Sequence, residues 1–214
     1  ITAAGGDFPD PDLARAYAGN AGRAVDWLAS RGADFGQGGD FPWMSRMLKP
    51  FSLREPGFRN HWPDKGAERL LDRLRGAVVA AGGQVRTGWR GQSLVMEDGR
   101  CTGLEALSRS GERLTVTAKA VILADGGFQG DPDLVRTHIS PMPERLCTRG
   151  AGTGRGDGLK MAAAVGAELV GLNRFYGHVQ ASEALTDDRL WPYPILDLLA
   201  SSAVVVGPDG RRFT

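Results

Sequence analysis

The sequence predicts an α/β fold with α+β elements, in which parallel strands are combined with an antiparallel β-meander. An unbroken apolar run at 121–124 is typical of a strand that is buried on both faces of a parallel sheet. Three alternating segments at 93–96, 101–107 and 113–117 are separated by an Asp-Gly and a Ser-Gly turn, a pattern that predicts antiparallel hairpins. The meander leads directly into the apolar run, which we therefore expect to be the central strand, at 120–124.

Helical periodicity predicts the elements that surround these strands. The first predicted helix has apolar residues at helical spacing from Leu13 to Leu28 and a C-cap at Gly32. Further helix signals occupy residues 65–81, the Asp-Pro-Asp start at 131–133 and residues 159–165. Short strands are expected at 84–87 and at 203–206. Residues 199–202 are expected to belong to the second of these strands. Residues 33–62 are predicted to be an irregular loop.

Composition excludes several classes of protein. The chain has 214 residues with 26 Lys and Arg against 25 Asp and Glu, so the charge pattern does not favour nucleic acid as a partner. No apolar run is long enough to span a membrane, and no signal peptide opens the chain. Cys101 and Cys147 match no metal-binding spacing, so we expect no metal site, two reduced thiols and a cytoplasmic location.

Two glycine-rich stretches are the candidate ligand-binding segments. The central strand stops at Asp125-Gly126-Gly127, and paired glycines allow the main chain to approach a ligand closely. Residues 152–158 form a second glycine-rich stretch directly before a helix, where free N–H groups favour anionic or hydroxylated ligand groups. Either stretch could also be a tight loop that binds nothing, and both interpretations stay open at this point.

Three segments resemble the fumarate reductase/succinate dehydrogenase flavoprotein family, also known as FAD-binding type 2. Residues 118–128 resemble its second FAD-contacting strand, residues 154–162 its Thr-Gly-Asp-Gly helix start, and residues 206–213 a turn of its capping domain. The motifs occur in the family's order, and the resemblance extends from about residue 10 to the last residue. Residues 191–194 are similar to the tricarballylate dehydrogenase branch, which includes the flavoprotein half of precorrin-3B synthases.

The resemblance implies an incomplete protein, because the family's N-terminal G-x-G-x-x-G segment has no counterpart here. The first residue is Ile, which agrees with a fragment of a longer chain. By similarity, residues 1–170 are part of an FAD-binding domain and residues 171–214 begin a substrate-capping domain. We expect the fragment alone to be inactive, to bind FAD poorly and to self-associate through an exposed sheet edge.

The resemblance also implies an activity, which is hydride transfer between FAD and a C–C bond next to a carboxylate. His178 would bind the carboxylate of a small substrate, an electron-transfer partner would be needed, and the general-acid arginine is expected beyond Thr214. The alternative for His178 is a core histidine bonded to a carbonyl group; it is followed by Val179, where the family often has proline. The residues that would contact FAD are Gly91, Ala124, Asp125, Gly126, Gly127, Gly154, Asp157 and Gly158. A precorrin-3B synthase-like flavoprotein and a non-catalytic α/β binding module remain alternatives.

Overall fold

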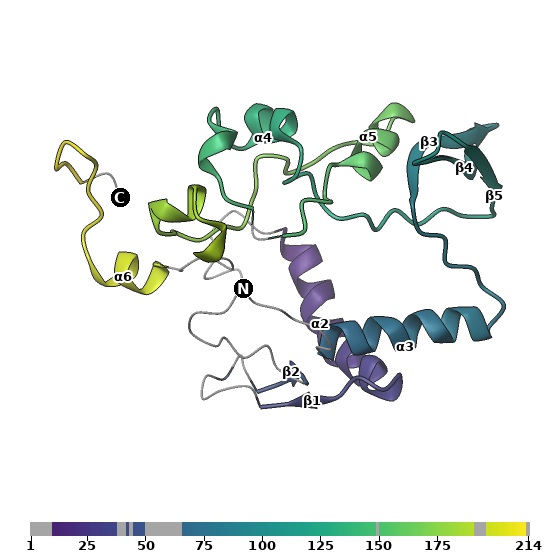
Figure 1. Ribbon diagram of the computed structural model, residues 1–214. Coiled ribbons are helices and arrows are strands. Elements are labelled where there is room, and N and C mark those ends of the chain that lie inside the picture. Colours follow the sequence, from purple (N-terminus) through teal and green to yellow (C-terminus); the bar gives the residue numbers. More distant parts are fainter. Residues whose placement is uncertain are drawn as a thin grey trace. The chain divides into compact units, whose positions relative to one another are not determined.

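The computed structural model describes residues 10–37, 42, 45–49, 66–148, 150–190 and 196–212. The chain divides into two compact units, Ile1–Arg86 and Thr87–Thr214 (Figure 1). The domain boundary predicted near residue 171 lies inside the second unit and stays a prediction.

The first unit contains two helices and a small hairpin. Helix α2 (Pro11–Ser30) begins at Asp10, whose carboxylate accepts the N–H groups of Asp12 and Leu13 at 2.9 and 3.0 Å. Helix α2 is followed by Gly32 at φ 92°, as predicted from the sequence. Strands β1 (Phe35–Gly36) and β2 (Met47–Leu48) pair antiparallel, inside the segment predicted to be an irregular loop.

Helix α3 (Gly66–Ala80) completes the first unit and confirms the helix predicted over 65–81. Gly66 is buried against the main chain of Lys49, where an added Cβ would lie 2.6 Å from the carbonyl oxygen. The guanidinium of Arg73 donates to the carbonyl oxygen of Gly32. Helix α3 is thus connected to the segments before it by the side chain of Arg73 and by the close approach of Gly66 to the main chain of Lys49.

The second unit begins with the predicted meander. Strands β3 (Trp89–Glu97), β4 (Arg100–Ser108) and β5 (Arg113–Thr117) form one antiparallel sheet in that order (Figure 1). The β3–β4 turn consists of Asp98 at φ 47° and Gly99 at φ 76°, the two positive values that a tight two-residue hairpin requires.

Short helices follow the meander. Helix α4 (Pro132–His138) begins at Asp131, which accepts the N–H groups of Asp133 and Leu134, and helix α5 (Asp157–Ala164) follows the second glycine-rich stretch. Both confirm helix starts that the sequence predicts. The remaining helical elements are η2 (Pro143–Arg145), η3 (Ser182–Leu185), η4 (Asp188–Leu190) and α6 (Asp197–Ser202).

The predicted central strand at 120–124 is wrong. These residues form no strand, and both observed sheets are antiparallel. Ile122, expected to be buried, is 89% exposed. The physical reason is that no strand of the described residues lies alongside this segment, and a β-strand needs a partner for its N–H and C=O groups.

Two further strand predictions are wrong. Residues 84–87 have no ladder partner among the described residues. Residues 199–202 belong to helix α6, where Asp197 in the first turn complements the positive end of the helix. Of the run 203–206, Val206 alone makes a β-bridge, with Arg212 across the turn at 207–210.

The buried apolar side chains are few and dispersed. Among the described residues they are Leu70, Ala106, Val135, Met161 and Ala184.

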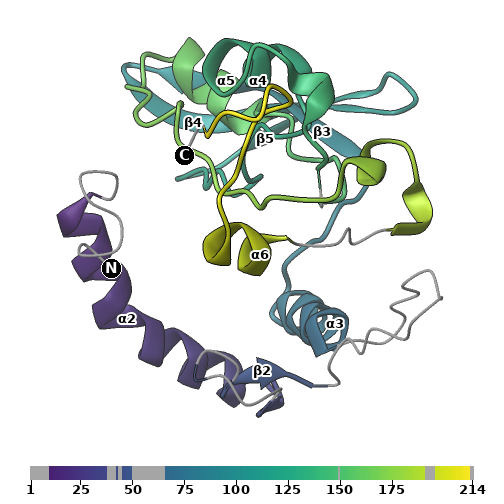
Figure 2. The same ribbon diagram turned by 90° about the vertical axis from the view of Figure 1, so that its left-hand side faces the viewer.

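Cys101 and Cys147 are free thiols. In the ranges that the structure describes, no helix is both long and apolar enough to cross a bilayer, and no cluster of His, Cys, Asp and Glu is arranged to hold a metal ion. The sheet and helix α5, which packs beside β3, position the candidate site (Figure 2).

Candidate functional site

The Asp125-Gly126-Gly127 corner presents open main chain. Residues 122–127 are exposed, and Gly126 has φ 87°, a conformation that favours glycine. A Cβ added at Gly126 would meet nothing within 4 Å, and one at Gly127 would meet only the amide oxygen of Gln129, at 2.9 Å. The described residues therefore do not fill the space in front of Gly126, which leaves room for a ligand to approach the backbone.

The second glycine-rich stretch runs directly against this corner. The N–H of Gly130 donates to the carbonyl of Gly154 at 2.7 Å, and the N–H of Gly156 donates to the carbonyl of Gly127 at 3.2 Å. A Cβ at Gly154 would lie 2.9 Å from the oxygen of Gly127. The close approach of two backbone segments thus accounts for the glycine at position 154 without a ligand.

Asp125 connects the corner to helix α5. Its carboxylate accepts the N–H of Gly158 at 2.7 Å, and a Cβ at Gly158 would overlap that carboxylate. Gly156, just before the helix, has φ 69° and ψ 28° in the left-handed region. The resemblance implies FAD contacts at this N-terminus, and in the structure a carboxylate of the chain itself accepts one of its N–H groups.

The carboxylate of Asp157 also has a hydrogen-bond partner within the chain. Its two oxygens accept hydrogen bonds from Nε and Nη2 of Arg90 on β3, at 2.7 and 2.6 Å. The hydrogen bonds from Arg90 are the main reason that the pKa of Asp157 lies below its ordinary value, and the charge of Arg90 adds to this effect, whereas partial burial opposes it. The same hydrogen bonds are the main reason that the pKa of Arg90 is raised. The pair fixes the first turn of α5 to the sheet.

Two neighbouring contacts complete the attachment of α5. An added Cβ at Gly91 on β3 would lie 3.0 Å from the Cε atom of Met161, so the Met161 side chain occupies the space over this residue, which was predicted to contact FAD. The ammonium of Lys160 lies 2.6 Å from Asp131 and 3.3 Å from the carbonyl of Arg155. The hydrogen bond from Lys160 is the main cause of a lowered pKa at Asp131.

His178 lies in a different part of the second unit and has partners at both ring nitrogens. Nδ1 contacts Oδ2 of Asp197, the first residue of α6, and Nε2 lies 2.9 Å from the hydroxyl oxygen of Tyr176. The other oxygen of Asp197 accepts the N–H of Val179 at 2.9 Å. The His178 side chain is 18% exposed, which leaves it partly accessible from solvent. Its partner is therefore a carboxylate, not the carbonyl group of the alternative considered from sequence.

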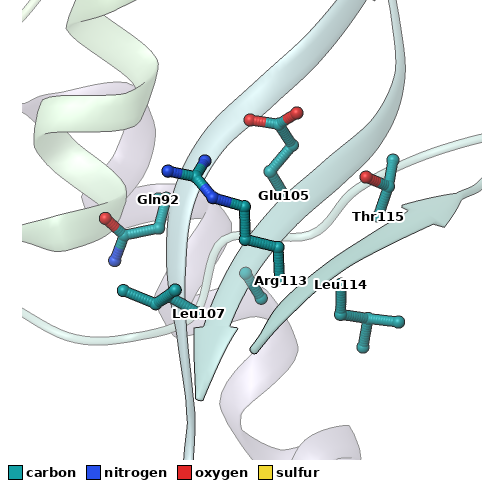
Figure 3. Close-up of a pocket in the computed structure, with 7 residues that line it drawn as sticks. Gln92, Glu105, Leu107, Arg113, Leu114 and Thr115 are labelled. Atoms are coloured by element: carbon teal, nitrogen blue, oxygen red, sulfur yellow. The ribbon is translucent and has the colours of Figure 1, made fainter. Parts of the chain in front are cut away.

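A small hollow lies on the meander, and its lining includes none of the predicted site residues. Its cavity volume is about 110 Å³, and its lining comes from all three strands: Gln92, Glu105, Ala106, Leu107, Arg113, Leu114 and Thr115. Figure 3 shows the side chains of Gln92, Glu105 and Arg113 gathered over it. The hollow is well below the size of sites that enclose a cofactor.

Sequence reasoning missed the partners of the predicted residues. Arg90 and Asp197 were not predicted, although Arg90 bonds to Asp157 and Asp197 bonds to His178. No local pattern singles out Asp197, because its partner His178 is 19 positions away along the chain. Arg90 is 67 positions from Asp157 along the chain, so their pairing depends on the fold alone.

Comparison with known proteins was consistent across sequence and structure. The profile of the FAD binding domain family matches residues 1–214. The NADH:acrylate oxidoreductase of Vibrio harveyi is 26% identical over 167 residues, which are 75% of this chain and 16% of that protein. The 4-oxocyclohexanecarboxylate 2-dehydrogenase of Sinomonas cyclohexanicum is 30% identical over 155 residues, 67% of this chain and 26% of that protein. The chain thus spans about a sixth to a quarter of these two relatives.

Solved structures agree on the fold. A flavocytochrome c3 fumarate reductase in its open conformation has 25% identity and a TM-score of 0.52, covering 70% of this chain and 25% of that one. The 3-ketosteroid-Δ4-(5α)-dehydrogenase of Rhodococcus jostii RHA1 has 23% identity and a TM-score of 0.59, covering 78% and 39%, and supports the fold only. The chain therefore belongs to the FAD binding domain family, as a relative of fumarate reductase-type flavoproteins, and FAD is the cofactor of that family.

Proposed function

We propose that this chain is part of an FAD-dependent oxidoreductase that acts on a C–C bond next to a carboxylate. Residues 1–170 would contribute to cofactor binding and residues 171–214 to the substrate side. Two relatives are named for reactions of acrylate and 4-oxocyclohexanecarboxylate, both of which are carboxylates. These names support a small carboxylate substrate as a class, of which a tricarballylate-like acid is one member.

The open main chain at Gly126 is the single observation that carries this proposal. A positive φ and the empty space in front of its Cα are features that a flat cofactor lying on backbone would require. Gly127 and the exposed Ala124 extend the same surface. FAD, when bound, supplies the hydride chemistry, while the protein supplies binding, orientation and electrostatics.

The neighbouring charged residues shape this surface. Asp125 and Gly158 bond to one another, and Asp157 is paired with Arg90, so these groups set the backbone position of the corner. We propose that Asp125, Asp157, Gly158 and Gly154 support the cofactor mainly by holding the two glycine-rich stretches together. Gly91 would act in the same way, by admitting Met161 of helix α5 against the sheet.

His178 would bind the substrate. An imidazole that is oriented through one nitrogen and partly exposed can offer the other nitrogen to a carboxylate. Because the ring is fixed at Nδ1, Nε2 is the atom that would meet the substrate in place of the hydroxyl of Tyr176. This placement would orient the carboxylate and with it the neighbouring C–C bond.

A matched pair of glycine substitutions tests the cofactor site. Gly126 and Gly111 have nearly the same φ, 87° and 88°, and neither has an atom within 4 Å of an added Cβ. Each Ala variant therefore carries a similar backbone strain of about 1–2 kcal/mol. In the full-length protein we expect Gly126→Ala to purify with little FAD and Gly111→Ala to retain a stoichiometric amount, as measured by flavin absorbance. Equal FAD content in the two variants would contradict the proposal.

A further inference from the structure

The hydrogen bonds around His178 determine where its proton lies. An ionised carboxylate has no proton to give, so the contact between Asp197 and Nδ1 requires an Nδ1–H donor. In the neutral ring, Nε2 then carries a lone pair and accepts the hydroxyl proton of Tyr176 at 2.9 Å. The titratable groups in contact with His178 among the described residues are these two, one from its own loop and one from α6.

A second contact makes the orientation of Asp197 specific. Its other oxygen accepts the main-chain N–H of Val179, and a main-chain N–H always donates. Both oxygens of Asp197 therefore face donors. Tyr176 is 85% exposed, so its hydroxyl can leave Nε2 when another polar group arrives.

We propose that Asp197 is a positioning residue that fixes the proton of neutral His178 on Nδ1 and thereby couples carboxylate binding at Nε2 to the uptake of one proton. The inference rests on the proposed function, in which His178 contacts the substrate carboxylate. A lone pair at Nε2 and a carboxylate oxygen are both acceptors and repel one another. Nε2 must therefore gain a proton from solvent, which gives an imidazolium whose Nε2–H donates to the incoming carboxylate.

Replacing Asp197 by asparagine should reverse this arrangement. The amide has one acceptor and one donor end, and the N–H of Val179 requires the acceptor end. The NH₂ group then faces Nδ1, so the neutral ring must accept at Nδ1 and carry its proton on Nε2. In Asp197→Asn, the neutral ring therefore offers Nε2–H to a carboxylate without proton uptake.

The tautomer is measured by ¹⁵N NMR of the full-length protein labelled at histidine, with the His178 resonances identified by their loss in His178→Gln. At alkaline pH we expect the unaltered protein to show a protonated Nδ1 and an unprotonated Nε2, and Asp197→Asn to show the reverse. The matched control is Asp187→Asn, which removes the same charge from a residue paired with Arg189 and should leave the tautomer unchanged. An unprotonated Nδ1 in the unaltered protein, or the same tautomer in Asp197→Asn, overturns the proposal.

Propionate is the probe for carboxylate binding. At a pH where the neutral ring predominates, calorimetry in buffers of different ionisation enthalpy should show uptake of one proton per propionate in the unaltered protein. Over this range the affinity for propionate should fall about tenfold per pH unit, whereas Asp197→Asn should lose this dependence. Propionate binding without proton uptake at such a pH overturns the coupling. If His178→Gln binds propionate as tightly as the unaltered protein, the proposed anchor is refuted, and the tautomer measurement still decides the role of Asp197.

Discussion

The meander and the 119–127 segment both contain glycines, but these glycines have different surroundings. In the meander, each strand has a partner, and Gly103 is buried against the neighbouring strand. In the 119–127 segment no described strand lies alongside, Ile122 is 89% exposed, and Gly126 faces open space. The same residue type therefore serves packing in one place and access in the other. The surroundings of a glycine, not its presence, indicate which role it has.

The largest effect is expected from an added methyl group in the meander. A Cβ at Gly103 would overlap the carbonyl oxygen of Val116 on β5, which is main chain and cannot turn away. We expect Gly103→Ala to lower the free energy of unfolding by about 2–3 kcal/mol, because the strands must separate locally. Urea denaturation of the full-length protein measures this change.

Gly111→Ala serves as the control for this substitution, since its methyl group meets nothing within 4 Å. The control should lose about 1–2 kcal/mol through backbone strain alone. Equal losses in the two variants would show that the close packing at Gly103 costs no more than backbone strain at an open turn.

A smaller effect is expected from the Arg90–Asp157 pair, and it should depend on pH. Because the pKa of Asp157 is lowered in the folded protein, the pair contributes stability above the ordinary value of 3.8 and loses it as the pH falls through the folded value. Arg90 is 57% exposed, so solvent screening limits the contribution to about 1 kcal/mol at neutral pH. Arg90→Gln should therefore be less stable than the unaltered protein at neutral pH, and the difference should shrink below pH 3.8.

Arg75→Gln provides the comparison for this pair. Arg75 and Asp72 are 64% and 70% exposed on α3, and this substitution should change stability less at every pH. A constant difference between Arg90→Gln and the unaltered protein down to acid pH would contradict the assignment of the pair to stability.

The smallest effect is expected at Asp187 and Arg189. The hydrogen bond from Arg189 lowers the pKa of Asp187 to about 2, yet both groups are in solvent contact. Arg189→Ala should raise this pKa toward 3.8, as followed by NMR titration of the carboxyl group. Thermal unfolding should not change measurably, and a lower unfolding temperature would show that the local pair supports more than its own turn.

The sequence predicted those elements whose partners are close along the chain. The helix C-cap at Gly32, the helix start at 131–133 and the hairpin turn at Asp98 and Gly99 depend on contacts within a few residues. These predictions were confirmed. The strand at 120–124 was wrong because its apolar composition indicates burial but cannot supply the neighbouring strands.

The candidate site was predictable to the same degree. Gly126 and Gly127 were identified from their position after an apolar run, and the space in front of Gly126 agrees with the proposed role. The helix start at 157–158 was also identified, but not that Asp125 and Arg90 would occupy its polar groups. Those contacts join residues 33 and 67 positions apart, and such pairings arise from tertiary structure.

Helix α5 is attached to three separate segments through residues in its first turn. Asp157 bonds to β3, Gly158 to the residue after the apolar run, and Lys160 to the start of α4. A rotation of this eight-residue helix would break all three bonds together. Its amide protons should therefore exchange with deuterated solvent in a single cooperative opening, with one shared protection factor, and not fray residue by residue from the end.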